Sequence, residues 1–167
     1  MGKIARLKRR PASQPFIYLI PDTRYLEENG IILPDVGDKL TGQFWPGPLT
    51  LILTVPPDSP LSPIAFKGSL AVRVSPHPFV RALFRHRRFP LVSTSANLSG
   101  SPEDDARDPK RIVDNFPEGV EYVITEGVLR PSPPSTLVDV RPSTPKLIRE
   151  GALPREVLSE FTQKSPL

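Results

Sequence analysis

The sequence of 167 residues contains no cysteine, which excludes several kinds of site. Without a thiol there can be no disulfide, no thiolate-bound metal and no cysteine nucleophile. The two histidines, His77 and His86, are too few for a histidine-rich zinc site. The longest apolar run, residues 49–55, is strand-sized, far short of the roughly 18–20 residues that span a membrane. No apolar stretch of signal-peptide type follows the basic start, so we expect a cytoplasmic protein with no membrane partner.

Three common nucleotide-binding or catalytic motifs are also missing from the sequence. It contains no glycine-rich phosphate-binding loop of the Walker type and no dinucleotide-binding fingerprint. It also lacks the G-x-S-x-G elbow of serine hydrolases. Functions that depend on one of these three motifs are therefore disfavoured.

Proline and positive charge are the abundant features. Proline accounts for 23 residues, and most of these fall between the expected strands and helices. The formal net charge is +4, but residues 1–10 carry five basic side chains and no acid, so the remainder of the chain is close to neutral. The length suits one domain, and no linker divides the sequence, so we expect a single domain over residues 1–167.

Apolar runs and helix-start signals predict six or seven strands interleaved with four or five helices. We expect the strands at 16–20, 49–55, 70–74, 90–92, 120–124, 136–140 and 146–149. We expect the helices at 2–9, 38–44, 78–87, 109–116 and 156–161. In the helix at 78–87, Phe79, Ala82 and Leu83 should face inward. This order predicts an α/β fold, a twisted open mixed sheet with helices packed on it.

Three segments carry candidate chemistry, and each leaves an alternative open. Lys8 and Arg10 could hold a triphosphate, or they could belong to a solvated or nucleic-acid-facing basic tail. The hydroxyl-rich segment 93–100 follows a strand and is either a ligand-binding loop or an ordinary polar turn. Arg73 lies inside an apolar strand, so its guanidinium must be paired, with an internal acid or with a ligand carboxylate. Arg149 likewise stands at a strand end.

The order of these segments resembles a known family. The sequence has Lys-x-Arg-Pro at 8–11, Trp-Pro-Gly-Pro-Leu-Thr at 45–50, and Leu-Ala-Val-Arg-Val at 70–74. It continues with Ser-Thr-Ser-Ala-Asn-Leu-Ser-Gly at 93–100, Ser-Thr-Leu-Val-Asp at 135–139 and Ile-Arg-Glu-Gly at 148–151. This set is similar to the YrdC-type threonylcarbamoyl-AMP synthases over nearly the whole chain. The resemblance implies formation of threonylcarbamoyl-AMP from L-threonine, bicarbonate and ATP, with Mg²⁺ on the nucleotide and release of pyrophosphate.

The resemblance also implies residue roles and partners. The residues implied for ATP binding are Lys8, Arg10, Gln14, Ser69, Ser95, Asn97 and Arg149. Those implied for threonine binding are Arg73, Ser93 and Ser135. No nucleophile and no metal ligand is implied. Downstream, the product would serve tRNA modification through a tRNA threonylcarbamoyl transferase complex, and tRNA or double-stranded RNA could bind.

Compared with the family pattern, the sequence lacks an N-terminal helix and strand, which a partner chain could replace. One alternative function is a catalytically impaired RNA- or nucleotide-binding module of the same fold. A weaker alternative is a related domain of hydrogenase-maturation proteins, which the absence of zinc-finger cysteines disfavours.

Overall fold

The computed structural model describes residues 2–9, 15–97 and 107–161, which fall into two compact units. The first unit comprises residues 1–15 and 94–132, and the second comprises residues 16–93 and 133–167. Each unit draws on separate stretches of the chain, so no single boundary divides the sequence. The expectation of one domain over residues 1–167 stays a prediction.

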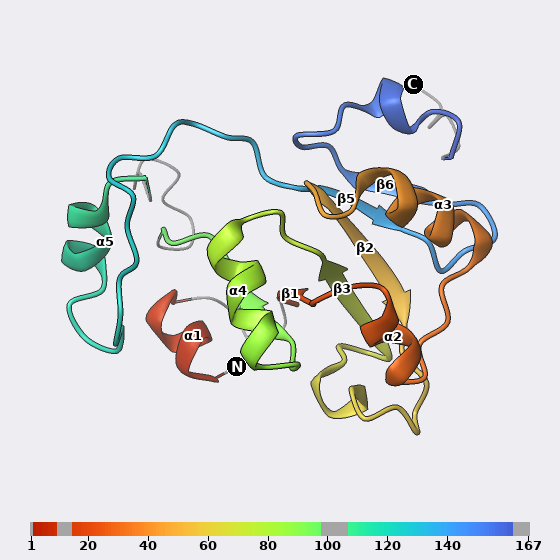
Figure 1. Cartoon of the computed structure of the whole chain (residues 1–167), viewed down its shortest axis with the longest axis horizontal. Helices are drawn as coiled ribbons and strands as arrows, with labels where there is room; N and C mark the ends of the chain where they lie inside the picture. Colours follow the sequence, from red (N-terminus) through yellow and green to blue (C-terminus); the bar gives the residue numbers. More distant parts are fainter. Residues whose placement is uncertain (1, 10–14, 98–106, 162–167) are drawn as a thin grey trace. The chain divides into compact units, whose positions relative to one another are not determined.

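The second unit is built on a mixed six-stranded sheet (Figure 1). The strands are β1 (Ile17–Leu19), β2 (Leu49–Thr54), β3 (Ser69–Arg73), β4 (Leu91–Ser93), β5 (Thr136–Asp139) and β6 (Lys146–Arg149). Their order across the sheet is β4-β1-β3-β2-β5-β6. The β1–β3 and β2–β5 pairs are parallel, and the other neighbours are antiparallel. The predicted open mixed α/β sheet is confirmed.

Three helices and two short 3₁₀ turns accompany this sheet. They are α2 (Arg24–Glu28), α3 (Asp35–Phe44), α4 (Pro78–His86), η1 (Ser62–Ile64) and η2 (Arg155–Leu158). Leu26 of α2, Leu40 of α3 and Leu158 of η2 are fully buried, so each element adds an apolar side chain to the core. At the start of α4, the side chain of His77 accepts a hydrogen bond from the amide of Phe79, as expected for a helix cap.

One face of the sheet forms the core of this unit. Successive side chains of a strand point to opposite faces, so Leu70 and Val72 of β3 share one face. Both are buried, as are Leu51 and Leu53 of the neighbouring β2. The alternate residues of β3 are only half-buried. The sheet therefore has one packed face and one more open face.

The first unit contains α1 (Gly2–Leu7) and α5 (Pro109–Asn115). Asp108 caps α5 by accepting a hydrogen bond from the amide of Lys110 at 2.9 Å, and proline occupies the first helical position. Both features agree with the helix expected there. No helix among the described residues is long and apolar enough to cross a membrane.

Five sequence expectations need correction. Residues 120–124 were expected to form a strand but join no sheet among the described residues. The helix α2 was not expected, α3 begins three residues earlier, and the last helix is the short turn η2. In α4, Phe84 is 8% exposed, whereas Phe79 and Leu83 are 39% and 40% exposed. Phe84 and the pair Phe79 and Leu83 lie on adjacent sides of this helix. The spacing of apolar residues alone does not decide which side faces the core.

Candidate active site

Residues implied for substrate binding lie on the more open face of the sheet. In β3, Ser69 and Arg73 share a face because they are four residues apart. Ala71 lies between them on that face and pairs with Ile17 of the neighbouring β1. Ile17 pairs in turn with Ser93 of β4. Directly paired residues point to the same side of a sheet, so Ser93 shares the face of Ser69 and Arg73.

The other half of the sheet adds two more of these residues to the same face. Ala71 also pairs with Ile52 of β2, which places Thr50, two residues earlier, on the open face. Thr50 pairs with Leu137 of β5, and Leu137 pairs with Arg149 of β6. Ser135 precedes Leu137 by two residues, and its hydroxyl lies 2.7 Å from that of Thr50. Five of the implied residues, from four segments of the chain, therefore share one face.

Along the strands, the implied residues separate into two groups. The register places Arg73, Arg149 and Ser135 toward the end of the sheet where β3 finishes. Ser69 begins β3, about 13 Å away at roughly 3.3 Å per residue. Its hydroxyl donates to the carbonyl of Phe66 at 2.9 Å and helps to close the turn at residues 67–68. The implied nucleotide contact of Ser69 stays a prediction.

Arg73 is held by the Trp-Pro-Gly-Pro turn. Its Nε donates to the carbonyl of Gly47 at 2.8 Å, and the Gly47 amide donates to the carbonyl of Val74 at 3.0 Å. The indole nitrogen of Trp45 donates to the carbonyl of Leu49 at 2.8 Å and closes the turn from the other side. No chemistry was expected of this turn from its sequence. The structure gives it the role of positioning Arg73.

No described carboxylate pairs with Arg73, so an internal acid is not its partner among these residues. Burial lowers the pKa of its guanidinium, but an arginine remains charged near neutrality. The hydrogen bond to Gly47 occupies Nε only. The two terminal nitrogens can therefore bind a carboxylate in the forked geometry that arginine favours.

Ser135, implied for threonine binding, contacts Arg149, which is implied for ATP binding. Its side chain is buried against Thr50, and its carbonyl accepts a hydrogen bond from Nη2 of Arg149 at 2.8 Å. Thr50 itself is fully buried. Thr50 was not among the residues expected at the site, although a threonine within the apolar run at 49–55 was a usable signal.

Thr136 fixes the chain that follows β6. Its hydroxyl accepts from the amides of Gly151 and Leu153, at 3.0 and 2.9 Å, and donates to the carbonyl of Leu153 at 2.7 Å. A side chain at Gly151 would place its Cβ 2.2 Å from the carbonyl oxygen of Pro134, so only glycine fits there. This packing holds Arg149 beside Ser135. Neither Thr136 nor Gly151 was assigned a role from the sequence.

In the first unit, two of the implied ATP-binding residues touch each other. The Lys8 side chain is 5% exposed, and its Nζ donates to the hydroxyl of Ser95 at 3.1 Å and to the carbonyl of Ser95. Asn97, two residues further on, is half-buried. Arg10 and Gln14 lie outside the described residues, so their implied roles stay predictions.

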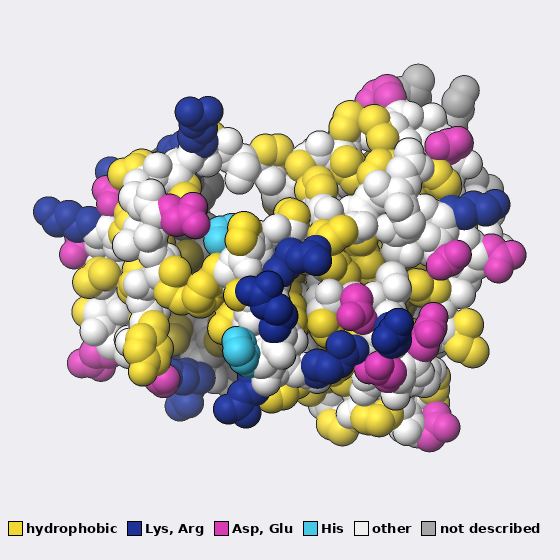
Figure 2. Space-filling view, in the orientation of Figure 1, with side chains coloured by type: hydrophobic (Ala, Val, Ile, Leu, Met, Phe, Trp, Pro, Cys, Tyr) yellow, Lys and Arg dark blue, Asp and Glu magenta, His cyan; other side chains and the backbone are white. Residues whose placement is uncertain are grey.

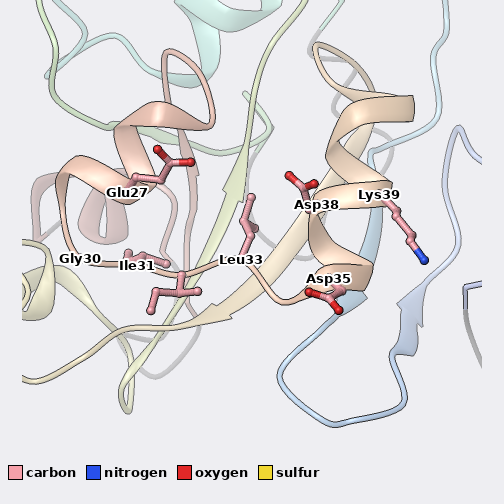
Figure 3. Close-up of a pocket in the computed structure, with 8 residues that line it drawn as sticks. Glu27, Gly30, Ile31, Leu33, Asp35, Asp38 and Lys39 are labelled. Atoms are coloured by element: carbon pink, nitrogen blue, oxygen red, sulfur yellow. The ribbon is translucent and has the colours of Figure 1, made fainter.

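A separate groove between α2 and α3 contains none of the implied residues. Its volume is about 520 Å³, and Figure 3 shows Glu27, Asp35, Asp38 and Lys39 around it, with Ile31 and Leu33 between the two helices. Three of its four charged residues are acidic, which suits neither a phosphate nor a carboxylate. We therefore assign the site to the open face of the sheet.

Comparison with known proteins decides the family. A family model described as "Telomere recombination", that of Sua5, YciO and YrdC proteins, matches residues 1–151. The chain belongs to the Sua5/YciO/YrdC family. The resemblance seen in the sequence motifs is thereby confirmed.

Individual members of the Sua5/YciO/YrdC family agree. The chain is 33% identical to threonylcarbamoyl-AMP synthase of Pyrococcus abyssi over 95% of its own length and 46% of the relative's. It is 33% identical to the Bacillus subtilis enzyme of the same name, over 92% and 44% of the two chains. It also matches the crystal structure of P. abyssi Sua5 complexed with L-threonine, with a TM-score of 0.81, 31% identity and coverage of 96% and 48%. The chain thus spans about half the length of these relatives.

Proposed function

We propose that this chain forms threonylcarbamoyl-AMP from L-threonine, bicarbonate and ATP, and releases pyrophosphate. The proposal rests on Arg73, a half-buried cation that forms an ion pair with no described carboxylate. Arg73 lies on the same face of the sheet as Ser135 and Arg149. An amino-acid substrate presents a carboxylate that suits such a cation. The matched synthases and the threonine-bound P. abyssi Sua5 support the proposal.

In this proposal, the threonine carboxylate binds the terminal nitrogens of Arg73. The hydroxyls of Ser93 and Ser135 orient the remainder of the amino acid. The amine of threonine is converted to a carbamate by bicarbonate, with loss of water. A carbamate oxygen then attacks the α-phosphorus of ATP, and the bond from that phosphorus to the leaving pyrophosphate breaks. No covalent enzyme intermediate is needed, which suits a chain with no assigned nucleophile.

The nucleotide is assigned to the remaining polar residues. We assign its binding to Lys8, Arg10, Gln14, Ser69, Ser95, Asn97 and Arg149. Cations near the phosphates stabilise the charge that develops on pyrophosphate as it leaves. Preorganised donors of this kind contribute more than donors that must reorient during the reaction.

Magnesium enters this reaction as part of the substrate. Among the residues that the structure describes, no group of three or more His, Cys, Asp or Glu side chains could hold a metal ion. In this proposal, Mg²⁺ binds the ATP phosphates and reaches the site with the nucleotide.

The product would feed a tRNA-modifying reaction. We propose a downstream tRNA threonylcarbamoyl transferase complex as the partner that consumes it, and a cytoplasmic location. Both follow from the family assignment and the proposed product.

A second candidate function is RNA or nucleotide binding without catalysis. Figure 2 shows Lys and Arg side chains gathered over α4. Arg81 and Arg85 of this helix are exposed, as is Arg87 directly after it. Phosphate contacts would make RNA affinity fall steeply as salt rises. The first candidate is favoured because Arg73, Ser135 and Arg149 lie on the sheet face and not on this helix.

Threonine-dependent pyrophosphate release tests the proposed function. We expect release only when threonine, bicarbonate and ATP are all present, and we expect Arg73→Ala to abolish it while ATP binding persists. The control is Arg81→Ala, which removes an exposed arginine of α4 and should leave the rate unchanged. Salt-sensitive RNA binding, together with no threonine-dependent release, would favour the second candidate.

A further inference from the structure

Thr50 and Ser135 form a pair of hydroxyl groups at the proposed threonine site. Their oxygens lie 2.7 Å apart, and the distance alone does not say which of them donates the proton. Thr50 is completely buried, whereas the exposed fraction of Ser135 is 6%. A ligand on the open face of the sheet can therefore reach Ser135 but not Thr50.

The alignment of the strands places Thr50 between Arg73 and Ser135. Leu51 of β2 pairs with Val72 of β3. The next step along the same antiparallel register brings Thr50 opposite Arg73. On the other side of β2, Thr50 contacts Ser135. The three side chains thus cross neighbouring strands on one face, with the buried hydroxyl in the middle.

Backbone hydrogen bonds on both sides of Ser135 hold this residue in place. The amide of Thr136 donates to the carbonyl of Pro48 at 2.9 Å. The amide of Ala152 donates to the carbonyl of Pro134, also at 2.9 Å. Because the backbone is fixed, the direction in which the Ser135 hydroxyl points depends on the contacts of its side chain.

Burial decides which of the two hydroxyls donates. A hydroxyl carries one proton and two acceptor lone pairs. Thr50 has no other side-chain hydrogen-bond partner among the described residues. If its proton pointed away from Ser135, that proton would be buried without an acceptor, which costs free energy. Thr50 therefore donates to Ser135, and the proton of Ser135 is left for a ligand.

We propose that Thr50 is a positioning residue for the amino-acid substrate, because its hydroxyl makes Ser135 a donor to an oxygen of that substrate. The inference rests on the proposed function, which places threonine beside Ser135. A hydroxyl that accepts one hydrogen bond donates a stronger one, since successive hydrogen bonds polarise each other. Threonine suits this role because its branched side chain is restricted in χ1.

Binding of L-threonine to Thr50→Val tests the inference. Valine keeps the branched shape of threonine and removes the hydroxyl. We expect the Kd from titration calorimetry and the KM from pyrophosphate release to rise about 3- to 10-fold, the effect of losing one neutral hydrogen bond. An unchanged kcat and an unchanged affinity for ATP alone would mark the loss as one of substrate binding.

Two further variants separate the hydroxyl from the shape of the side chain. Thr50→Ser restores the hydroxyl and should recover the affinity for threonine. Thr54→Val makes the same change as Thr50→Val at the exposed end of the same strand, and should leave that affinity as it was.

A comparison of stabilities tests the direction of the hydrogen bond without any ligand. Ser135→Ala leaves the Thr50 proton buried without an acceptor, whereas Thr50→Val leaves a Ser135 hydroxyl that retains some exposure. The midpoint of urea unfolding should therefore fall further in Ser135→Ala than in Thr50→Val. Adding Thr50→Val to Ser135→Ala should recover part of the loss, because it removes the unsatisfied proton.

Three results would overturn the inference. They are an unchanged affinity for threonine in Thr50→Val, a loss of affinity that Thr50→Ser does not recover, and a larger loss of stability in Thr50→Val than in Ser135→Ala. Failure of the proposed function gives a different result: the natural chain itself would neither bind threonine nor release pyrophosphate. That result would overturn the function and the inference together.

Discussion

The Nε atom of Arg73 donates a hydrogen bond to the carbonyl oxygen of Gly47, 2.8 Å away. This bond joins the end of β3 to a turn that precedes β2 in the sequence. It constrains the guanidinium through Nε and leaves its two terminal nitrogens available for other hydrogen bonds. The Trp-Pro-Gly-Pro motif and the arginine motif look independent in the sequence. In the structure they are in contact, and the turn positions the arginine.

Gly47→Ala should destabilise the protein and weaken threonine binding. The new Cβ would lie 2.2 Å from the carbonyl oxygen of Phe44, so the turn must shift and carry the Gly47 carbonyl with it. We expect a loss of about 1–3 kcal/mol in unfolding free energy, as for other forced overpacking. Denaturant unfolding measures this loss, and titration calorimetry with threonine measures the weaker binding.

The matched control is Gly42→Ala. Gly42 lies inside α3, with nothing within 4 Å of an added Cβ, so alanine should stabilise by about 0.5–1 kcal/mol. Equal stability changes in the two variants would contradict the role given to the turn.

Thr136→Val should destabilise the end of the sheet that holds Arg149. The valine keeps the shape of the threonine but leaves the amides of Gly151 and Leu153 without their acceptor. Each unsatisfied buried group costs about 1–3 kcal/mol, so we expect a loss of about 2–4 kcal/mol by chemical denaturation. Thr54→Val, at the exposed end of β2, serves as the comparison and should change stability by less than ~0.5 kcal/mol. Similar losses in both would show that the hydroxyl of Thr136 has no special role.

Lys8→Met should weaken ATP binding by roughly 10- to 100-fold, the effect of losing a charge-assisted contact of about 1.5–3 kcal/mol. Methionine keeps the apolar stem of this buried side chain and removes its ammonium group. Fluorescence titration with a nucleotide analogue measures the change. Lys3→Met removes the exposed lysine that pairs with Glu121 and should leave the affinity as it was. Unchanged ATP affinity in Lys8→Met would remove Lys8 from the nucleotide site.

The interaction of Asp139 with Arg141 predicts that the free energy of unfolding falls in acid. The side-chain hydrogen bond from Arg141 lowers the pKa of the Asp139 carboxyl, despite the opposing effect of its burial. A carboxyl with a lower pKa in the folded state stabilises the fold above its unfolded pKa of about 3.9 and loses that contribution as the pH falls through the folded value. Stability measured from pH 7 downward should therefore drop below about pH 4.

Asp139→Asn isolates this contribution. The variant should be less stable than the natural chain at pH 7, and the difference between the two should shrink in acid. A difference that stays constant from pH 7 to about pH 2 would rule out the ion pair as its source.

The sheet was predictable from the sequence because its strands are short apolar runs bounded by proline, glycine and polar residues. Arg73 and Ser135 share a face only because of how β3, β2 and β5 are aligned with one another. The sequence of a single strand does not encode that alignment. Residues 120–124 are rich in strand-forming side chains, yet a strand also needs a neighbour, and none of the described residues supplies one. Contacts such as Thr50 with Ser135, or Gly47 with Arg73, join distant parts of the sequence. Local patterns cannot reveal such contacts.

Ser135 has one further consequence. Its hydroxyl contacts Thr50 and its carbonyl contacts Arg149, so one residue belongs to both proposed subsites. A ligand that draws Arg149 away from Ser135 alters the surroundings of the other subsite. Such communication is reciprocal: whatever factor the nucleotide applies to the affinity for threonine, threonine must apply to the affinity for the nucleotide. The order in which the two substrates bind can then change the rates of assembly but not the stability of the assembled complex.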